Sequence, residues 1–213
     1  DYSNVWDAEI DQWHHAVEET SAAGWFRAAQ VTHTPMDYLY LSEDTTLEDL
    51  KCYPLLVYPH ATIITEETAA LLKAYVEAGG RLVMGCRTGY KDEQGRCLMQ
   101  PKPGPPAELF GVTVADFTFV GPADDPVGVQ WEGQRLDAAT FNDILKPTEG
   151  AEVLGEFDSN YYAGKPALTR KKLGGGEAYY FGAAFSQDAA AAFLEKLGVA
   201  EPWKEWVESP AGC

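Results

Sequence analysis

A cysteine stands directly after the most clearly predicted strand of the chain, in the segment GCRTG. Such a turn exposes the sulfur of Cys86 as a thiolate nucleophile if a base, usually a histidine, lies on a neighbouring strand end. All four histidines lie within the first 60 residues, and the last predicted strand ends in GAAF, without the histidine that a cysteine–histidine–acid order requires. His60 ends the strand beside that of Cys86, so a cysteine hydrolase built on these two residues is one alternative. The other alternative is a small residue packed at a strand end.

The loop that follows Cys86 carries a second set of candidate residues. It runs to Pro106, is polar and rich in glycine and proline, and includes Arg87, Asp92 and Glu93. Open α/β sheets bind ligands at the carboxyl ends of their parallel strands. We therefore treat Arg87, Asp92 and Glu93 as candidate binding residues.

Other residues with suitable chemistry favour no reaction. His14 and His15 are consecutive, so on a helix they diverge and cannot share a metal ion. The run LGGGE lacks the lysine and the serine or threonine of a phosphate loop and is typical of a turn. Tyr161, Tyr162 and several tryptophans could stack on sugar rings, which keeps a carbohydrate-binding module as an alternative, although core and interface roles fit them equally well. We expect no catalytic residue, metal or cofactor in this chain.

The composition limits the class of protein. Of 213 residues, 46% are hydrophobic, which is enough for one good core but not for two large domains. Lysine and arginine total 16 against 33 aspartates and glutamates, a net charge of -17. A surface this acidic repels phosphate backbones and anionic lipids, so we predict no nucleic-acid or membrane partner. No apolar run approaches the ~18 residues that span a bilayer.

The cysteines and the start of the chain indicate the cellular compartment in which we expect the protein. Four cysteines show neither a CxxC motif nor paired spacing, which predicts reduced thiols in a cytoplasm. The opening DYSNVWDAEI has neither the basic start nor the apolar stretch of a signal peptide. Because it lacks an initiating methionine, we expect a fragment or a trimmed product.

The elements that must position these residues follow from spacing and capping. The stripe Trp6, Ile10, Trp13 and Val17 predicts a first helix that ends near Gly24, with acidic residues on its other face. A short strand is predicted at 38–41. A strand at 55–58, a helix capped by Thr65 and a strand at 81–85 form a βαβ unit with parallel strands.

The second half of the chain is richer in strand signals. Alternation predicts strands within 112–131, further strands at 153–157, 167–170 and 178–181, and a hairpin turn at the glycine run. Ser186 caps a final helix that ends at Gly198. A doubly wound sheet normally opens with an apolar strand before its first helix. Here the helix comes almost at once, so we expect that first strand to have been cut off or to lie upstream.

Ordered segments of the chain resemble a known family. They are the opening DYSNVWD, then MDYLYL, YPLLVYPHATIITEETAALLKAYVEAGGRLVMGCRTGYKDE, PGPPAELFGVTV and AEVLGEFDSNYYAGKPALTRKKLGGGEAYYFGAAF. Together they resemble the middle, or trimerisation, domain of family 42 glycoside hydrolases, which are β-galactosidases. The resemblance covers nearly the whole chain, although no single segment is a catalytic signature.

The resemblance implies a fold, a domain organisation and a set of partners. The fold is α/β and flavodoxin-like, a three-layer sandwich of class I amidotransferase type with a mostly parallel central sheet, in which the nucleophilic activity of the fold relatives has been lost. Residues 1–200 form the domain and residues 201–213 a linker toward an absent C-terminal domain. The partners are a catalytic (β/α)8 barrel with two glutamates and identical copies in a trimer, where the domain helps to wall a neighbouring active site.

The leading hypothesis is therefore a non-catalytic assembly domain. A (β/α)8 barrel takes ~250 residues, so this chain is too short to hold one beside the α/β unit. Assembly requires an apolar patch that outweighs repulsion between copies that each carry a charge of -17. The candidate interface residues form a predicted strand pair: Phe117, Phe119, Val127, Val129 and Trp131.

Overall fold

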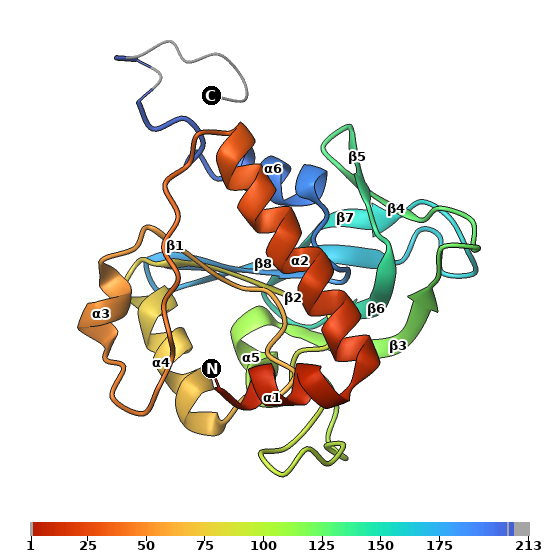
Figure 1. Ribbon diagram of the computed structural model, residues 1–213, viewed down its shortest axis with the longest axis horizontal. Coiled ribbons are helices and arrows are strands. Elements are labelled where there is room, and N and C mark those ends of the chain that lie inside the picture. The colour runs from red at the N-terminus through yellow and green to blue at the C-terminus, as the bar shows by residue number, and fades with distance from the viewer. Residues whose placement is uncertain (1, 204, 207–213) are drawn as a thin grey trace.

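The structure is a computed structural model and describes residues 2–203, 205 and 206 (Figure 1). Its helices are α1 (Tyr2–Ile10), α2 (Gln12–Val31), α3 (Leu47–Lys51), α4 (Glu66–Glu77), α5 (Ala107–Phe110) and α6 (Gln187–Lys196). Its strands are β1 (Leu55–Tyr58), β2 (Arg81–Gly85), β3 (Val112–Val120), β4 (Gly128–Trp131), β5 (Gln134–Asp137), β6 (Thr140–Pro147), β7 (Ala151–Phe157), β8 (Pro166–Leu173) and β9 (Gly176–Phe181).

The predicted βαβ unit is confirmed. β1 and β2 pair in parallel, and β2 pairs in parallel with β9 on its other side. The hydroxyl of Thr65 accepts a hydrogen bond from the backbone N–H of Thr68 and so caps α4. Gly79 follows the helix with φ +108°, a backbone conformation that favours glycine. These local signals lie within 31 residues of sequence, which is why the pattern alone could identify them.

The prediction of a mostly parallel sheet is wrong. The main sheet has the order β1-β2-β9-β8-β7-β4-β5, and every pair from β9 to β5 is antiparallel. The physical reason is the length of the connections. Two-residue turns link β4 to β5 and β8 to β9, and a loop at 158–165 links β7 to β8, whereas parallel neighbours need a crossover of a dozen or more residues. The chain is therefore a mixed α/β protein whose sheet is parallel only at the β1 end.

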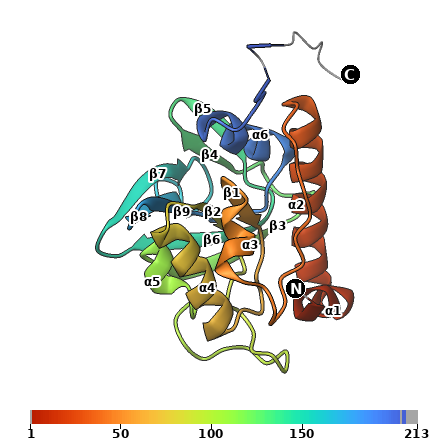
Figure 2. The ribbon, with the colours of Figure 1, turned by 90° about the vertical axis from the view of Figure 1, so that its left-hand side faces the viewer.

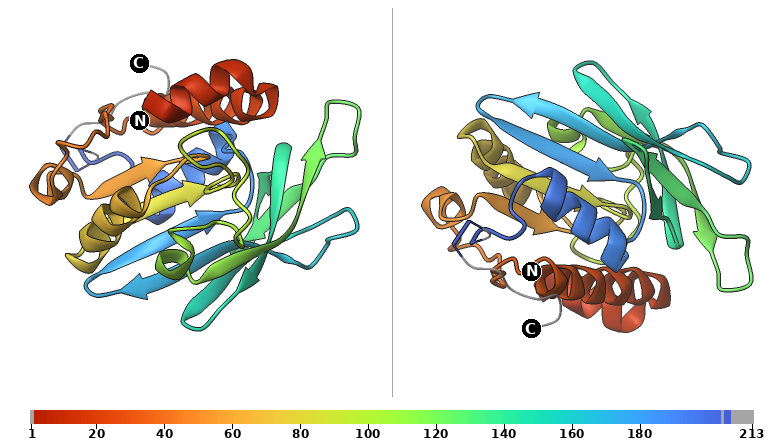
Figure 3. Two further views of the ribbon diagram at one scale, coloured as in Figure 1. Left: turned by 90° about the horizontal axis from the view of Figure 1, so that it is seen from below. Right: turned by 90° about the horizontal axis from the view of Figure 1, so that it is seen from above.

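β3 and β6 form a second, two-stranded sheet that is not part of the strand order of the main one. β3 and β6 pair antiparallel from Val112 opposite Pro147 to Val120 opposite Thr140, with a bulge between Val114 and Asp116. The alternation predicted for this region is thus confirmed as a strand. β6 also contacts β8, so this sheet lies against the main one (Figure 3).

Helices cover both faces of the parallel end of the main sheet. Figure 3 shows α2 and α6 on one side of it and α4 and α5 on the other. Side chains alternate accordingly along β2: Val83 packs with Trp25 and Phe193 on the first side, whereas Leu82 and Met84 pack with the α4 side. Each face therefore has its own apolar core.

The first helix differs from its prediction in two ways. It is broken at Asp11, whose carboxylate accepts hydrogen bonds from the N–H groups of Trp13 and His14 and so starts α2 as a separate helix. It also continues past Gly24 to Val31. A Cβ at Gly24 would lie 2.1 Å from the carbonyl oxygen of Phe185, so glycine here permits close packing and does not end the helix.

The predicted strand at 38–41 is also wrong as a strand. The chain turns back after α2 and runs as an extended segment to α3 (Figure 2), but residues 38–41 carry no strand pairing. Among the described residues, no backbone hydrogen bond joins 35–41 to β1. An extended segment becomes a strand only when a neighbour satisfies its backbone groups. The final helix, by contrast, is confirmed as α6 with its Ser186 cap.

In the part of the chain that the structure describes, every helix is too short or too polar to span a bilayer.

Candidate functional site

Cys86 and His60 do meet at the carboxyl ends of β1 and β2. The sulfur of Cys86 lies 3.8 Å from Nδ1 of His60. The same Nδ1 lies 2.8 Å from the carbonyl oxygen of Cys86. Because a carbonyl oxygen only accepts, Nδ1 carries the proton and donates it to the backbone. This nitrogen is therefore not free to deprotonate the thiol.

The other nitrogen of His60 is occupied as well. Nε2 lies 2.5 Å from the hydroxyl of Ser21, which in turn accepts a hydrogen bond from the N–H of Phe185 at 2.8 Å. With Nδ1 protonated, Nε2 accepts from the hydroxyl. Burial lowers the pKa of His60 to about 3, so the ring stays neutral. His60 thus ties α2, β2 and the segment after β9 together as a structural residue.

The thiol itself is not activated. Cys86 is fully buried, and burial, reinforced by the negative charge of Asp143, raises its pKa well above the ordinary value. A nucleophilic cysteine needs a lowered pKa and access to substrate. Cys86 has neither, and it does not line either of the cavities described below. The geometry therefore matches the packed-residue alternative.

Asp143 is a buried carboxylate that the sequence analysis missed. It lies on β6 and accepts hydrogen bonds from the hydroxyls of Tyr90 (2.6 Å) and Tyr180 (3.0 Å) and from the N–H of Arg87 (3.0 Å). Burial raises its pKa to about 6, although these donors oppose the shift. One signal was present in the sequence: in the segment FNDIL, a charged residue lies between apolar residues.

A network of ion pairs fills the space between α1, α2 and the loop after β2. Nζ of Lys91 contacts Asp7 at 2.7 Å and Asp11 at 2.8 Å, and the guanidinium of Arg87 contacts Asp11 at 2.8 Å. Nδ1 of His14 lies 2.8 Å from the carboxylate of Asp7. All five side chains are largely buried, with Asp7 only 3% exposed. Two carboxylates thus face two cations, although Nε2 of His14 and Nε of Arg87 are buried without a hydrogen-bond partner among the described residues.

The pKa shifts of Asp11, His14 and Lys91 reflect both the burial of this network and its ion pairs. Burial alone would raise the pKa of Asp11, but hydrogen bonds from Lys91 and from the backbone of His14, together with the charge of Arg87, hold it well below its usual value. Burial lowers the pKa of His14 against the opposing effect of Asp7. Burial alone would lower the pKa of Lys91, but its bonds to Asp11 and Asp7 raise it instead.

The candidate binding residues Arg87, Asp92 and Glu93 are not brought together. Arg87 is 7% exposed and turns inward, with its guanidinium carbon 5.3 Å from the ring centre of Phe141. The Asp92 carboxylate accepts hydrogen bonds from the N–H groups of Gln94 and Arg96, so it stabilises its own turn. Glu93 is exposed. A binding role for these residues remains a prediction.

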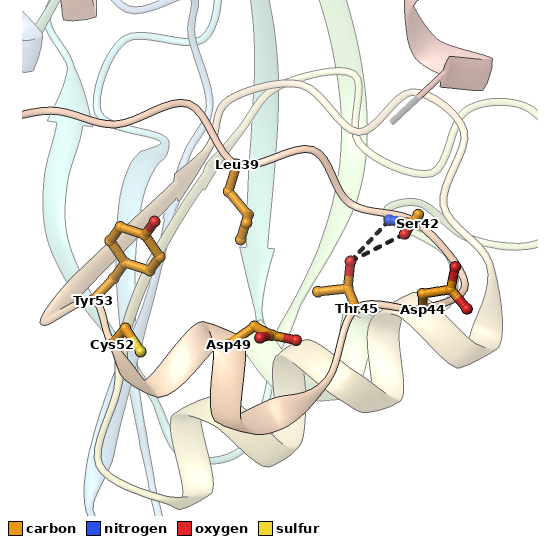
Figure 4. A pocket seen from close by; sticks show the side chains of 7 residues that line it. All are labelled: Leu39, Ser42, Asp44, Thr45, Asp49, Cys52 and Tyr53. Carbon is orange, nitrogen blue, oxygen red and sulfur yellow. Dashed lines mark hydrogen bonds between the residues drawn. The ribbon is translucent and has the colours of Figure 1, made fainter.

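A shallow cavity of about 360 Å³ lies above α3 (Figure 4). It is lined by Leu39, Ser42, Asp44, Thr45, Asp49, Cys52 and Tyr53. The carboxylate of Asp49 accepts from the N–H and the hydroxyl of Thr46, so it forms the helix cap. The hydroxyl of Thr45 accepts from the N–H of Ser42. The Asp49 carboxylate and the Thr45 hydroxyl, both drawn in Figure 4, thus stabilise the loop and the start of α3.

A larger, apolar groove of about 420 Å³ lies between α2, residues 34–41 and β1. Its lining includes Trp25, Leu39, Leu41, Leu55 and Val57. Two carboxylates, Glu18 and Asp37, also line it, and its one histidine, His60, is already bonded at both nitrogens.

The remaining signals from the sequence are structural. Gly174 lies at φ +58° in the turn between β8 and β9, and a Cβ there would meet the backbone of Glu77. Tyr162 is buried and its hydroxyl accepts from Asn142, whereas Tyr161 is exposed and its hydroxyl donates to Asp116. Within residues 2–203, 205 and 206, no three His, Cys, Asp or Glu side chains are arranged to hold a metal ion.

The predicted interface strands are mostly core. Val127, Val129 and Trp131 are at most 3% exposed and belong to the core beneath α6. They do not form an exposed strand pair, because β4 pairs with β5 and β7 in the main sheet. Of the five residues, Phe117 is 50% exposed and Phe119 is half-buried.

An exposed apolar surface lies on α1 instead. We define the α1 apolar face as Tyr2, Trp6 and Ile10 of α1 together with Trp13, the second residue of α2; they are 42% to 80% exposed. The rings of Tyr2 and Trp6 are 6.0 Å apart, and Trp13 lies 4.0 Å from Phe119. This contact joins the α1 apolar face to Phe117 and Phe119 on β3. Monomeric proteins rarely expose large contiguous apolar patches, so such a patch indicates an interaction site.

The α1 apolar face reverses the orientation predicted from periodicity. The stripe of Trp6, Ile10, Trp13 and Val17 was expected to face the core, with the acidic residues facing solvent. Val17 is buried as expected, but the other three are exposed. In the structure Asp7 faces inward to Lys91, and the tryptophans face outward. Periodicity finds a stripe but does not say whether the stripe meets its own core or another molecule.

Comparisons with known proteins agree on one family. The family described as "Beta-galactosidase trimerisation domain" matches residues 1–201. The chain is 32% identical over 176 residues to the β-galactosidase BglY of Alicyclobacillus acidocaldarius, covering 78% of this chain and 25% of that protein. It is 28% identical over 204 residues to the β-galactosidase BgaH of Haloferax lucentense, covering 92% of this chain and 29% of that protein.

A solved structure gives the same result. The polyextremophilic β-galactosidase of the Antarctic haloarchaeon Halorubrum lacusprofundi matches with a TM-score of 0.75 and 26% identity, covering 87% of this chain and 26% of that one. The chain thus spans about a quarter of the length of the β-galactosidases it matches.

Proposed function

The chain belongs to the β-galactosidase trimerisation domain family, and we propose that it is the non-catalytic assembly module of a family 42 β-galactosidase, joining three subunits. One observation carries this proposal: the α1 apolar face is exposed on a protein with a net charge of -17. Large apolar side chains at such a surface lower the free energy when a second apolar surface covers them.

Polar contacts hold the inner side of α1 against the rest of the protein, which favours a contact role for the α1 apolar face. Asn4, on the inner side of α1, accepts from the N–H of Ile63 at 2.9 Å and donates to its carbonyl at 2.8 Å. Asp7 is held by Lys91 and His14 on the same side. α1 is thus fixed to the protein by polar contacts, and its apolar residues are left for another molecule. Apolar side chains on a helix that is already held in one orientation lose less conformational entropy on binding.

The residues of this chain support a role without catalysis. His60 donates to a backbone carbonyl and accepts from Ser21, while Cys86 is buried and protonated. Retaining hydrolysis of a galactoside requires two carboxyl groups about 5–5.5 Å apart beside the substrate. We place that pair in the rest of the parent protein, in a catalytic barrel. Through the trimer, this module would also help to wall a neighbouring active site.

Three finer proposals accompany the assembly role. The module spans residues 1–200 and is followed by a linker at 201–213, of which residues 204 and 207–213 lie outside the described part. The βαβ unit with Cys86 after β2 supports an origin in an amidotransferase-like fold. Cys52, Cys86 and Cys97 are free thiols, which supports a cytoplasmic location; Cys213 lies outside the described residues.

Light scattering on the parent protein tests the assembly role. At micromolar concentration we expect a mass three times that of the subunit. A parent that remains monomeric at that concentration would contradict the proposal. The 213-residue chain is measured in parallel, because a trimer of this chain alone would place the whole contact within it.

A further inference from the structure

A trimer needs two different contact surfaces on every copy. Three copies around a three-fold axis form a closed ring, in which each contact joins one patch to a different patch of the next copy. A patch that meets its own equivalent gives a two-fold pair instead. The α1 apolar face of one copy must therefore meet a different surface of its neighbour.

The charges around the α1 apolar face limit what that surface can be. Residues 1–26 contain six aspartates and glutamates and neither lysine nor arginine. Glu9 is exposed and lies three residues after Trp6, so on the helix it flanks the apolar face. A second acidic patch would be repelled. A surface that presents an exposed cation beside an apolar side chain is complementary to this one.

The loop between β2 and α5 presents such a pair of side chains. We define the β2–α5 hairpin as residues 90–99, in which Lys91 pairs antiparallel with Cys97. Arg96 is exposed, and its guanidinium has no ion pair in the described part of the chain. Met99 is 97% exposed, the highest value among the large apolar side chains that the structure describes. Met99 therefore packs against almost nothing in its own copy.

The tip of the β2–α5 hairpin is held in one shape. The N–H of Asp92 donates to the carbonyl of Arg96 at 2.8 Å, and the carboxylate of Asp92 accepts from the N–H of Arg96 at 2.8 Å. After the turn, Nζ of Lys102 donates to the carbonyls of Leu98 and Gln100. A tip that is already ordered loses less conformational entropy on binding.

The β2–α5 hairpin adjoins α1 but does not cover the α1 apolar face. Its Lys91 contacts Asp7 on the inner side of α1 at 2.7 Å, whereas Trp6 and Ile10 are exposed on the outer side. The loop projects at the end of the molecule where α1 lies (Figures 1 and 2). In a three-fold ring the two contact surfaces of each subunit meet along the axis, so patches that adjoin on one copy suit this arrangement.

We propose that the tip of the β2–α5 hairpin docks on the α1 apolar face of the next copy in the trimer. Met99 packs against Trp6 and Ile10, and the guanidinium of Arg96 pairs with Glu9. The flexible, polarizable side chain of methionine adapts to an aromatic surface, and the ion pair fixes the register of the contact. The inference rests on the proposed function, because it names the surface that meets the α1 apolar face.

A charge swap in the parent protein tests the ion pair. Arg96→Glu and Glu9→Arg each place like charges opposite one another, so we expect each to raise the dissociation constant of the trimer about tenfold. The swapped variant, which carries both changes, should return to within about threefold of the wild type. Analytical ultracentrifugation measures the constants. A swapped variant no better than the single variants would overturn the proposal.

Lys165→Glu is the matched control for Arg96→Glu. Lys165 is also an exposed cation without an ion pair in the described part of the chain, and its reversal changes the net charge by the same amount. We expect this variant to keep the dissociation constant of the wild type. An equal weakening by Lys165→Glu would show that general repulsion between acidic copies, and not a contact of Arg96, governs assembly.

Mixing two altered subunits tests which surfaces meet. Trp6→Glu with Ile10→Glu removes the α1 apolar face, and Met99→Glu with Arg96→Glu removes the hairpin tip. We expect each variant alone to have the mass of one subunit and the mixture to form pairs, because one intact contact remains. A mixture without pairs would contradict the proposal. If the tip variant alone stays trimeric while the α1 variant is monomeric, only the hairpin is wrong; a monomeric wild-type parent contradicts the proposed function itself.

Discussion

Trp6 and Asp7 are neighbours on α1 that face opposite environments: the indole of Trp6 is 54% exposed, while Asp7 is 3% exposed and bonded to Lys91. This is the reverse of an ordinary amphipathic helix, in which the apolar side faces the core and the acidic side faces water. The reversal is stable because Lys91 and His14 satisfy the buried carboxylate. It leaves Trp6, Ile10 and Trp13 available to another molecule.

Replacing Lys91 should be strongly destabilising. Lys91→Met leaves the carboxylates of Asp7 and Asp11 buried without their shared cation, and breaking a buried ion pair costs about 3 kcal/mol or more. Lys51→Met is the matched control, because Lys51 pairs with Glu48 at the surface and such a pair contributes at most about 1 kcal/mol. Urea unfolding of the two variants measures the difference. Equal losses of unfolding free energy would show that the network contributes little.

Asp143→Asn should remove a pH dependence of stability. The pKa of Asp143 is raised by burial to about 6 in the folded protein, against 3.8 as its ordinary value. Between these values the folded protein keeps a proton that the unfolded chain has lost. The stability contributed by this group is therefore fully present below the lower value and is lost as the pH rises through the higher one.

The size of that effect follows from the shift. About two pKa units correspond to about 3 kcal/mol. From about pH 4 to about pH 7 we expect the wild type to lose about 2 kcal/mol more unfolding free energy than Asp143→Asn does, because part of the effect is already lost at pH 4. Taking the difference between the proteins removes the contributions of other groups, such as Asp11, whose lowered pKa acts in the opposite direction. Parallel pH profiles for the two proteins would argue against a raised Asp143 pKa.

Cys86 should be unreactive in the folded protein. Burial and the charge of Asp143 raise the pKa of its thiol, whereas Cys52 and Cys97 are exposed. With iodoacetamide, peptide-level mass spectrometry should show that Cys86 reacts about 100-fold more slowly than Cys52, since both thiolate fraction and access control the rate. In denaturant the rates should converge. Fast alkylation of native Cys86 would revive the cysteine hydrolase alternative.

Much of the fold could be predicted where the signals are local. The Thr65 and Ser186 caps and the apolar strands at 55–58 and 81–85 identify α4, α6, β1 and β2, because each signal lies within one element or its immediate neighbours. The hairpin of β8 and β9 at the glycine run was also predicted correctly. The rest of the antiparallel pairing was missed, because the short runs in β4 to β7 do not specify their partners. Pairing such as β7 with β4 depends on contacts distant in sequence.

The site was harder to predict for the same reason. The partner that turns Asp7 inward, Lys91, is 84 residues away. The pairing of Asp143 with Tyr90 and Tyr180 likewise spans 53 and 37 residues. The proximity of His60 and Cys86 was left open as one alternative, because both follow adjacent strands. Their protonation depends on Ser21 and on a backbone carbonyl, which the sequence does not identify. The apolar stripe on α1 was found, but its direction was not.

The most direct test of the assembly role replaces two residues of the α1 apolar face in the parent protein and measures its mass by light scattering. Trp6→Glu combined with Ile10→Glu adds charge to an exposed surface, so we expect folding to be retained. The matched control is Val31→Glu, because Val31 is also apolar, helical and 44% exposed but lies at the far end of α2. We predict that the double variant has the mass of a single subunit and that the Val31 variant keeps three times that mass. A double variant that stays trimeric would contradict the assignment of the α1 apolar face as the contact between subunits.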